Sequence, residues 1–167
     1  MGRLLRAVMT AGALLVSGSA MADETSFAAS KHATPIRIPP SMLAGQGLGE
    51  FGAWPDEMVL EGESASDHSL SEVFSGEIVV GVYESAPIKL AITSPWPFDE
   101  LVVVLGGELR LVPSGATEPM IFPAGAFALV PRGYTGTWEM RGEYREVFVI
   151  EQRAWAASQE PGGMLSE

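Results

Sequence analysis

The stretch PRGYTGTWE, residues 131–139, decides the fold of this chain. Pro131 presets the φ angle of a tight turn, and Gly133 supplies the positive φ that such a turn needs. The residues that follow, TGTWEM (135–140), have the composition of a β-strand. Upstream, Gly125 and the five residues AFALV precede Pro131. The spacing therefore predicts one short, inward-facing strand between two tight turns.

Short runs of the same kind extend over the second half of the chain. They are rich in β-branched or aromatic residues, and Gly, Pro, Ser or Asp bounds each of them. The runs are 77–85, 88–94, 100–112, 120–125, 126–131, 135–140 and 145–152. Their spacing of about ten residues is typical of an all-β sandwich or barrel. Gly106–Gly107 predicts a strand bend, PSGA (113–116) a hairpin tip, and 66–74 is compatible with one helical turn.

Two ordered motifs in this region resemble those of the cupins. Glu100, six residues and Gly107 match the second half of the first cupin motif, and Gly125, AFALV, Pro131-Arg132-Gly133 and YT match the second motif up to its last position. PFDELVVVLGGEL (97–109) and FPAGAFALVPRGYTGTWE (122–139) are similar to the branch related to ureidoglycine aminohydrolase and the ethanolamine-utilisation cupin. The resemblance implies an all-β double-stranded β-helix, a jelly-roll barrel, over residues 51–152, followed by a C-terminal tail at 153–167.

The chain departs from the cupin pattern at the metal ligands. The histidine positions of the two motifs fall at about Ser94, Trp96 and Gly136, so that only Glu100 remains of the usual ligand set. A divalent metal needs several converging N, O or S donors, and one carboxylate does not make a site. We therefore predict no metal in the usual cupin position, no cofactor, and no metal-dependent dioxygenase or aminohydrolase chemistry.

Strand alternation suggests which side chains face the barrel interior instead. If Glu100 points inward, Val102 and Val104 follow it, and Trp138 shares the face of Gly136. Trp96 is expected to lie opposite, so the predicted site is a metal-free pocket with aromatic walls and one carboxylate. For Glu100 the alternatives are a general base and a structural carboxylate bonded to neighbours. For the two tryptophans they are ligand stacking and core packing.

Further candidates are expected across the cavity and at the mouth of the predicted barrel. Tyr83 is a candidate acid, and since Glu84 follows it directly, at most one of the two is expected to point inward. Tyr134 and Arg132 flank the turn at the barrel mouth, where they either bind a carboxylate or belong to a solvated turn. His68 is expected on the surface of a polar loop, and His32 falls in the N-terminal arm.

The N-terminal region has the pattern of a secretory signal peptide. Arg3 and Arg6 precede an apolar run (7–19), and AMA (20–22) supplies small residues for cleavage after Ala22. The alternative is an uncleaved membrane anchor, although the run is short for a membrane span. We expect a periplasmic or secreted protein whose residues 23–50 form a flexible, irregular arm, with one short strand at Ile36–Ile38.

The composition of the chain limits its domain organisation and the classes of partner that it can bind. The chain of 167 residues is 47% hydrophobic and has no cysteine, which predicts one domain held by its core without disulfides. Removing residues 1–22 takes away two arginines and no acid, which moves the formal net charge from −11 to −13. Such an acidic surface disfavours nucleic acid and membrane surfaces as partners.

Three functions remain open from the sequence. The first is a metal-independent cupin that binds a small organic ligand, as a homodimer paired through N-terminal strands as the resemblance implies. The second is a metal-free isomerase, lyase or hydrolase with Glu100 as base and a tyrosine as acid. The third is a structural or interaction module with a filled barrel. A cavity lined by Glu100 and a second ionisable group favours the enzyme, aromatics alone favour binding, and no cavity favours the third.

Overall fold

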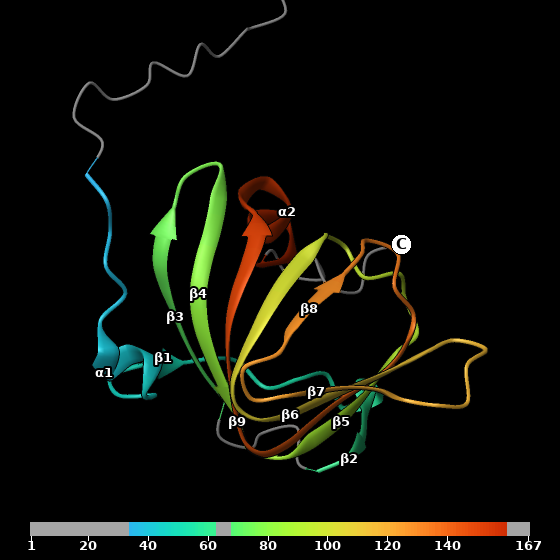
Figure 1. The fold of residues 1–167 in the computed structure, drawn as a ribbon. Coiled ribbons are helices and arrows are strands. Elements are labelled where there is room, and N and C mark those ends of the chain that lie inside the picture. Colours follow the sequence, from blue (N-terminus) through green and yellow to red (C-terminus); the bar gives the residue numbers. More distant parts are fainter. Residues whose placement is uncertain (1–33, 63–67, 160–167) are drawn as a thin grey trace, which may run out of the picture. The chain divides into compact units, whose positions relative to one another are not determined.

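A β-sheet curled on itself forms the bulk of the computed structural model, which describes residues 34–62 and 68–159 (Figure 1). A compact unit begins at Ile36. Outside the described residues lie the predicted signal peptide and residues 23–33 of the predicted arm, which include His32. Within the described ranges, no helix is both long enough and apolar enough to cross a membrane.

The elements follow one another with short connections. The strands are β1 (Gly49–Glu50), β2 (Val59–Glu61), β3 (His68–Ser75), β4 (Ile78–Ser85), β5 (Ile88–Ile92), β6 (Glu100–Pro113), β7 (Met120–Pro123), β8 (Phe127–Val130) and β9 (Gly136–Glu151). The helices are α1 (Pro40–Leu43), a 3-10 turn η1 (Asp56–Met58) and α2 (Gln152–Gln159). Each strand run predicted from the sequence holds a strand, and the last two runs, 135–140 and 145–152, fall within the single strand β9.

The long strands β6 and β9 connect two layers of the sheet. Every pairing is antiparallel, and β9 pairs with β4, β5 and β6. One half of β6 and β9 lies beside β3, β4 and β8, and the other half beside β7, β5 and β2 (Figure 1). The β6–β9 register shifts on both sides of Gly106, as the predicted bend requires. The predicted hairpin tip also forms, since the Ala116 N–H donates to the Pro113 carbonyl.

Alternation along the strands fills the interior. Glu100, Val102 and Val104 of β6 are buried while the residues between them are more exposed, as predicted. Opposite them, even-numbered residues of β9 from Trp138 to Ile150 supply most of the facing core. One contiguous cluster of apolar side chains results, and it holds the barrel without disulfides.

Three local predictions differ from the structure. Residues 68–75 form β3 rather than a helical turn, because His68 to Ser75 pair with β4 over most of their length. No strand forms at Ile36–Ile38, and the arm instead contributes α1, which begins at Pro40, and β1, which pairs with β3. In place of a tail from 153, α2 packs on the barrel through Trp155, whose ring centroid lies 5.2 Å from that of Phe148.

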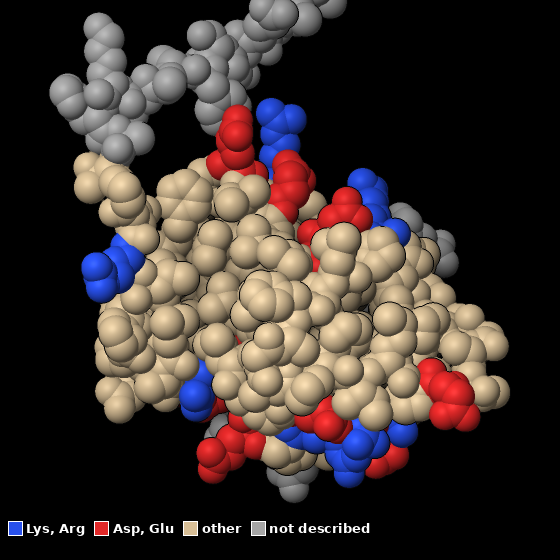
Figure 2. Space-filling model, viewed as in Figure 1, with Lys and Arg blue, Asp and Glu red and all other residues tan. Residues whose placement is uncertain are grey.

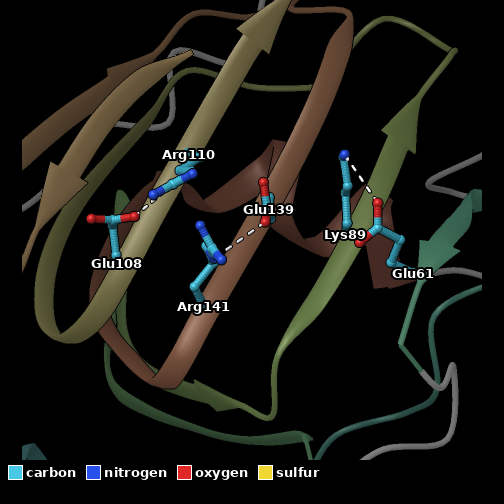
Figure 3. Close-up of polar contacts among 6 residues, drawn as sticks. All are labelled: Glu61, Lys89, Glu108, Arg110, Glu139 and Arg141. Atoms are coloured by element: carbon cyan, nitrogen blue, oxygen red, sulfur yellow. Dashed lines mark hydrogen bonds and ion pairs between the residues drawn. The ribbon is translucent and has the colours of Figure 1, made fainter.

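The outer faces of the two layers differ in polarity. On the layer of β7, β5 and β2, short ion pairs line the surface (Figure 3). They are Glu108–Arg110 at 2.6 Å, Glu139–Arg141 at 3.4 Å and Glu61–Lys89 at 3.2 Å. On the layer of β3, β4 and β8 the view in Figure 2 shows a broad surface without charged residues, and charges gather along its edges. The large exposed apolar residues of this layer are Phe74, Ile78, Leu101, Phe127 and Leu129.

Candidate functional site

A small cavity of about 50 Å³ lies inside the barrel. Most of its lining is aromatic or aliphatic, and its ionisable lining residues are Tyr83, Glu100 and Glu146. A buried water needs roughly 10–15 Å³ measured this way, so the cavity has room for a few waters or a molecule of a few heavy atoms. The described residues thus form a barrel that is neither open like a channel nor completely filled.

Glu100 stands at the start of β6 with its side chain in the cavity. It is 5% exposed, and the Trp96 indole Nε1–H donates to its Oε2 at 3.0 Å. Burial raises the pKa of this carboxyl well above its usual value, the negative charge of Glu146 raises it further, and the Trp96 bond opposes the shift. The prediction that Glu100 faces inward is confirmed, and a carboxyl in this setting tends to hold its proton near neutral pH.

Glu146 is the ionisable group that the sequence analysis missed. It projects from β9 into the same cavity, and the Tyr144 hydroxyl donates to its Oε2. Burial raises the pKa of Glu146 to about 7, against the opposing effect of the Tyr144 bond. Glu146 is an even number of residues from Trp138 along β9, so the two side chains lie on the same face of the strand. This spacing was the one sequence feature that indicated an inward-facing Glu146. The run EVFVI (146–150) is apolar on both faces after its first residue, so alternation alone did not separate inside from outside.

Tyr83 and His68 form a second polar group beside the pair of glutamates. Tyr83 is the cross-strand neighbour of Glu146, and its hydroxyl shares a hydrogen bond of 2.8 Å with Nδ1 of His68 and accepts one of 3.3 Å from Trp54 Nε1. Burial raises the pKa of Tyr83, so it stays protonated. The prediction of a surface His68 is wrong: it is 5% exposed, because β3 carries it against β4.

The prediction that only one of Tyr83 and Glu84 points inward is confirmed. Tyr83 is 5% exposed and lines the cavity. Glu84 lies on the opposite face of β4, where its Oε2 accepts a 2.6 Å bond from Nε of Arg145. The β-strand alternation that the sequence analysis used therefore holds at this position.

The other predicted ligand contacts fall into two groups. Trp96 and Trp138 both line the cavity, with ring centroids 5.2 Å apart and planes inclined by 33°. Tyr134 and Arg132 do not line it. The Tyr134 hydroxyl donates to the Thr137 carbonyl at 2.7 Å, and Arg132 is exposed in the turn, where its backbone N–H donates to Asp99 Oδ1 at 2.8 Å.

Gly136 shows why a metal of the usual cupin type does not fit this barrel. Its φ is +145°, and a Cβ atom at this position would collide with the Val112 carbonyl oxygen of β6. A histidine side chain therefore has no place there without a change of backbone. The candidate donor Glu100 is already bonded to Trp96, and among residues 34–62 and 68–159 no group of three His, Cys, Asp or Glu could hold a metal ion.

The curled antiparallel sheet, with its paired motifs around Glu100 and Pro131, is the double-stranded β-helix that defines a cupin. Residues 72–148 match the family model described as the EutQ-like cupin domain. This part of the chain is therefore similar to the EutQ-like cupin domain. None of the curated proteins matches the chain.

Several solved structures are similar to this chain at low sequence identity. A protein of unknown function of the DUF861 family from Pseudomonas syringae pv. tomato has a TM-score of 0.55 and 17% identity, with 62% of this chain and 43% of that chain covered. This chain thus spans less than half of that protein. A putative ethanolamine utilization protein Q from Salmonella typhimurium has a TM-score of 0.48, 22% identity and coverage of 63% and 78%. Clostridium difficile EutQ has a TM-score of 0.46, 15% identity and coverage of 61% and 81%.

Proposed function

We propose that this chain is an exported, metal-independent cupin whose barrel binds a small organic molecule. The observation that carries the proposal is the cavity of about 50 Å³, which joins the paired indoles of Trp96 and Trp138 to the carboxyls of Glu100 and Glu146. Concave apolar sites with a few convergent polar groups are where proteins bind small ligands. The cavity also argues against a barrel filled entirely by its own side chains.

The polar groups in the cavity are held in place, as a binding site requires. Trp96 fixes one oxygen of Glu100, and Tyr144 fixes one oxygen of Glu146. The bonds from Trp54 and His68 orient the Tyr83 hydroxyl in the same way. Side chains positioned by such neighbours lose little conformational entropy when a ligand arrives. The small volume limits that ligand to a few heavy atoms unless the barrel expands on binding.

The test is elemental analysis and native mass spectrometry of the protein purified from its own host without chelators. We expect no stoichiometric metal and a co-purified organic mass that is released on unfolding. The polypeptide mass reports on export at the same time, because cleavage after Ala22 removes residues 1–22. Stoichiometric metal would contradict the metal-independent site, and a protein that carries no small molecule and binds none from a library would contradict ligand binding.

A second candidate function is acid–base catalysis on the bound molecule. The observation that favours it is the second ionisable group, since both Glu146 and Tyr83 line the cavity with Glu100. Two carboxyls in one apolar site do not ionise together easily, so one stays protonated while the other is available to accept a proton. In this function Glu100 is the base in its ionised form, and Tyr83 is the candidate acid.

Catalysis is tested with the co-purified molecule in deuterated water. Deuterium incorporation or conversion, followed by NMR, is expected to disappear in Glu100→Gln and Tyr83→Phe even at ligand concentrations that saturate each variant. A molecule that is bound and released unchanged by the wild-type protein would leave binding as the function.

A further inference from the structure

The ionisable groups around the cavity share one sign. Tyr83, Glu100 and Glu146 are all acids, and among the residues that the structure describes no lysine, arginine or histidine lines the cavity. The chain has the same bias as a whole, with 21 acidic and 10 basic residues. A ligand that carries a carboxylate or phosphate would therefore meet like charge without a counter-ion, which strongly disfavours it in an apolar site.

Each carboxyl keeps one oxygen for a ligand. The hydrogen bonds that Glu100 and Glu146 accept from Trp96 and Tyr144 both end on Oε2. A carboxyl group has several lone-pair positions, so the second oxygen of each residue retains acceptor capacity. Both residues are 5% exposed, so bulk water does not supply the missing donors freely. A ligand with N–H donors satisfies these oxygens.

The cavity walls offer aromatic rings to such a ligand. Trp96 and Trp138 lie 5.2 Å apart, and Phe98 meets the Trp96 ring edge-on at 5.4 Å. Tryptophan presents the most favourable ring face to a cation, and the interaction strengthens when the site is desolvated. Aromatic walls joined to a carboxylate form the usual chemical setting for an organic ammonium or guanidinium group.

We propose that the barrel ligand is a small organic cation with N–H donors, of the ammonium or guanidinium class. It contacts the indole rings of Trp96 and Trp138 on one side and the carboxyls of Glu100 and Glu146 on the other. This proposal rests on the proposed binding function and specifies its ligand class. The cation replaces a proton: when it binds, the carboxyl that carried the proton releases it, so that the site remains close to neutral.

Because binding releases a proton, the affinity for the cation depends on pH. The titratable groups that face the two carboxyls are Tyr144 on β9 and Tyr83 on β4, with His68 on β3 behind Tyr83. Both tyrosines remain protonated at neutral pH because burial raises the pKa of each. The affinity for a cation therefore follows the glutamates and rises with pH, by up to about tenfold per pH unit while one proton is released.

The experiment compares guanidinium with urea, which share a planar shape and differ in charge, together with methylammonium. Binding to the full chain is followed by NMR of the Trp96 indole N–H, at about pH 6 and pH 8. We expect saturable shifts with both cations and much weaker ones with urea, with tighter binding at the higher pH. Glu100→Gln and Glu146→Gln are each expected to weaken cation binding by about tenfold to a hundredfold. Glu143→Gln, which removes an exposed carboxyl of β9, is the control and leaves it unchanged.

The outcomes separate the two proposals. Urea binding as tightly as guanidinium, or cation binding that survives both glutamine variants, overturns the cation class and leaves a small-molecule site. If none of the three probes shifts the Trp96 signal and no organic mass co-purifies, the binding function itself is overturned.

A separate observation concerns the outer surface of the layer of β3, β4 and β8. We define its apolar face by residues that the pairing places side by side on that surface: Phe74, Ile78, Val80, Leu101, Val103, Phe127, Leu129, Val147 and Val149. Phe127 and Leu129 are 67% and 71% exposed, which is unusual for large apolar side chains on a chain of such charge. Figure 2 shows this apolar face free of charged residues, with charges along its rim.

We infer that a second copy of this chain covers the apolar face. Two copies with a formal net charge of −11 repel each other wherever their acidic residues meet. A face without charges is where two such copies can associate, and an apolar patch needs no charge matching to pair with itself around a two-fold axis. An apolar centre with a charged rim is also the anatomy of a stable interface.

Sedimentation analysis of the full chain at about 10 μM tests this interface, since a dimer with a Kd near 1 μM is mostly formed there. We expect a dimer for the wild type and a monomer for the double variant F127E/L129E. Ile121→Glu, at a residue 49% exposed on β7 outside the apolar face, is the control and is expected to remain dimeric. A wild-type monomer, or a dimer that survives F127E/L129E, would overturn the inference.

Discussion

Replacing Glu146 by glutamine is expected to stabilise the protein, by an amount that grows with pH. Burial raises the pKa of this carboxyl from 4.5 to about 7 in the folded chain. Between these two values the unfolded chain releases the proton while the folded chain retains it. The folded state then binds more protons, so the free energy of unfolding of the wild type falls as the pH rises through this window.

The magnitude follows from the size of the shift. Each pKa unit corresponds to about 1.4 kcal/mol, so the wild type loses about 3 kcal/mol between pH 4 and pH 8 through this residue alone. Glutamine is neutral at every pH and has nearly the same shape, and its side-chain oxygen still accepts the Tyr144 hydroxyl. The variant is therefore expected to match the wild type near pH 4 and to exceed it by about 3 kcal/mol near pH 8. Relief of the repulsion on Glu100 adds to the gain.

The assay is urea denaturation of both proteins, followed by circular dichroism over this pH range. Glu143→Gln removes the same formal charge from an exposed position of β9 and is the matched control. It is expected to show no comparable gain. A Glu146→Gln protein that is less stable than the wild type at pH 8, or a gain independent of pH, would show that Glu146 ionises normally in the folded state and would refute the reasoning.

Three further substitutions test individual contacts, each by urea denaturation. Trp96→Phe keeps the aromatic ring but removes the indole donor to Glu100. It is expected to destabilise the protein by about 1–3 kcal/mol, because a buried carboxyl loses its hydrogen-bond donor; an unchanged stability would contradict this contact. Gly136→Ala is expected to destabilise the protein by at least about 2 kcal/mol, because φ is +145° and the added Cβ would collide with backbone atoms. Gly133→Ala, where space is open, is expected to cost only about 1 kcal/mol. Equal losses would contradict the close approach at Gly136. Trp155→Ala is expected to lose about 3–5 kcal/mol, because the indole packs on the core and donates to Glu72 Oε1 at 2.7 Å; a loss below about 1 kcal/mol would show that α2 is not part of the barrel.

The strands of the barrel were predictable because local chemistry specifies them. Turn residues such as Pro131 and Gly133 fix where strands begin and end, and the β-branched runs between them have one plausible conformation. The helix α2 was not predictable in the same way. It is short, and its stability comes from Trp155, which packs on Phe148 of the preceding strand and donates to Glu72 of the distant strand β3, rather than from a repeating helical pattern.

The inward-facing residues of the site could be predicted only where alternation within a single strand decides the orientation of the side chain. Glu100 and Tyr83 could be placed by alternation within their own strands. Glu146 and His68 could not, because their burial depends on strands far away in the sequence. His68 looks like a loop residue in SASDHSL (64–70), and only its pairing opposite Ser85 brings it beside Tyr83. A single sequence does not reveal which distant strands pair, or in which register.

The position of β9 in the sheet has a consequence for how the chain folds. This strand contacts β4, β5 and β6, so that Val80 pairs with Val149 and Ile92 with Gly136. It also follows all the other strands of the barrel in chain order. Until it leaves the ribosome, the preceding strands lack their central partner and the barrel cannot close. Such non-local pairing makes folding slow compared with helical proteins of the same size. The nascent barrel consequently stays open until the residues of β9 have emerged.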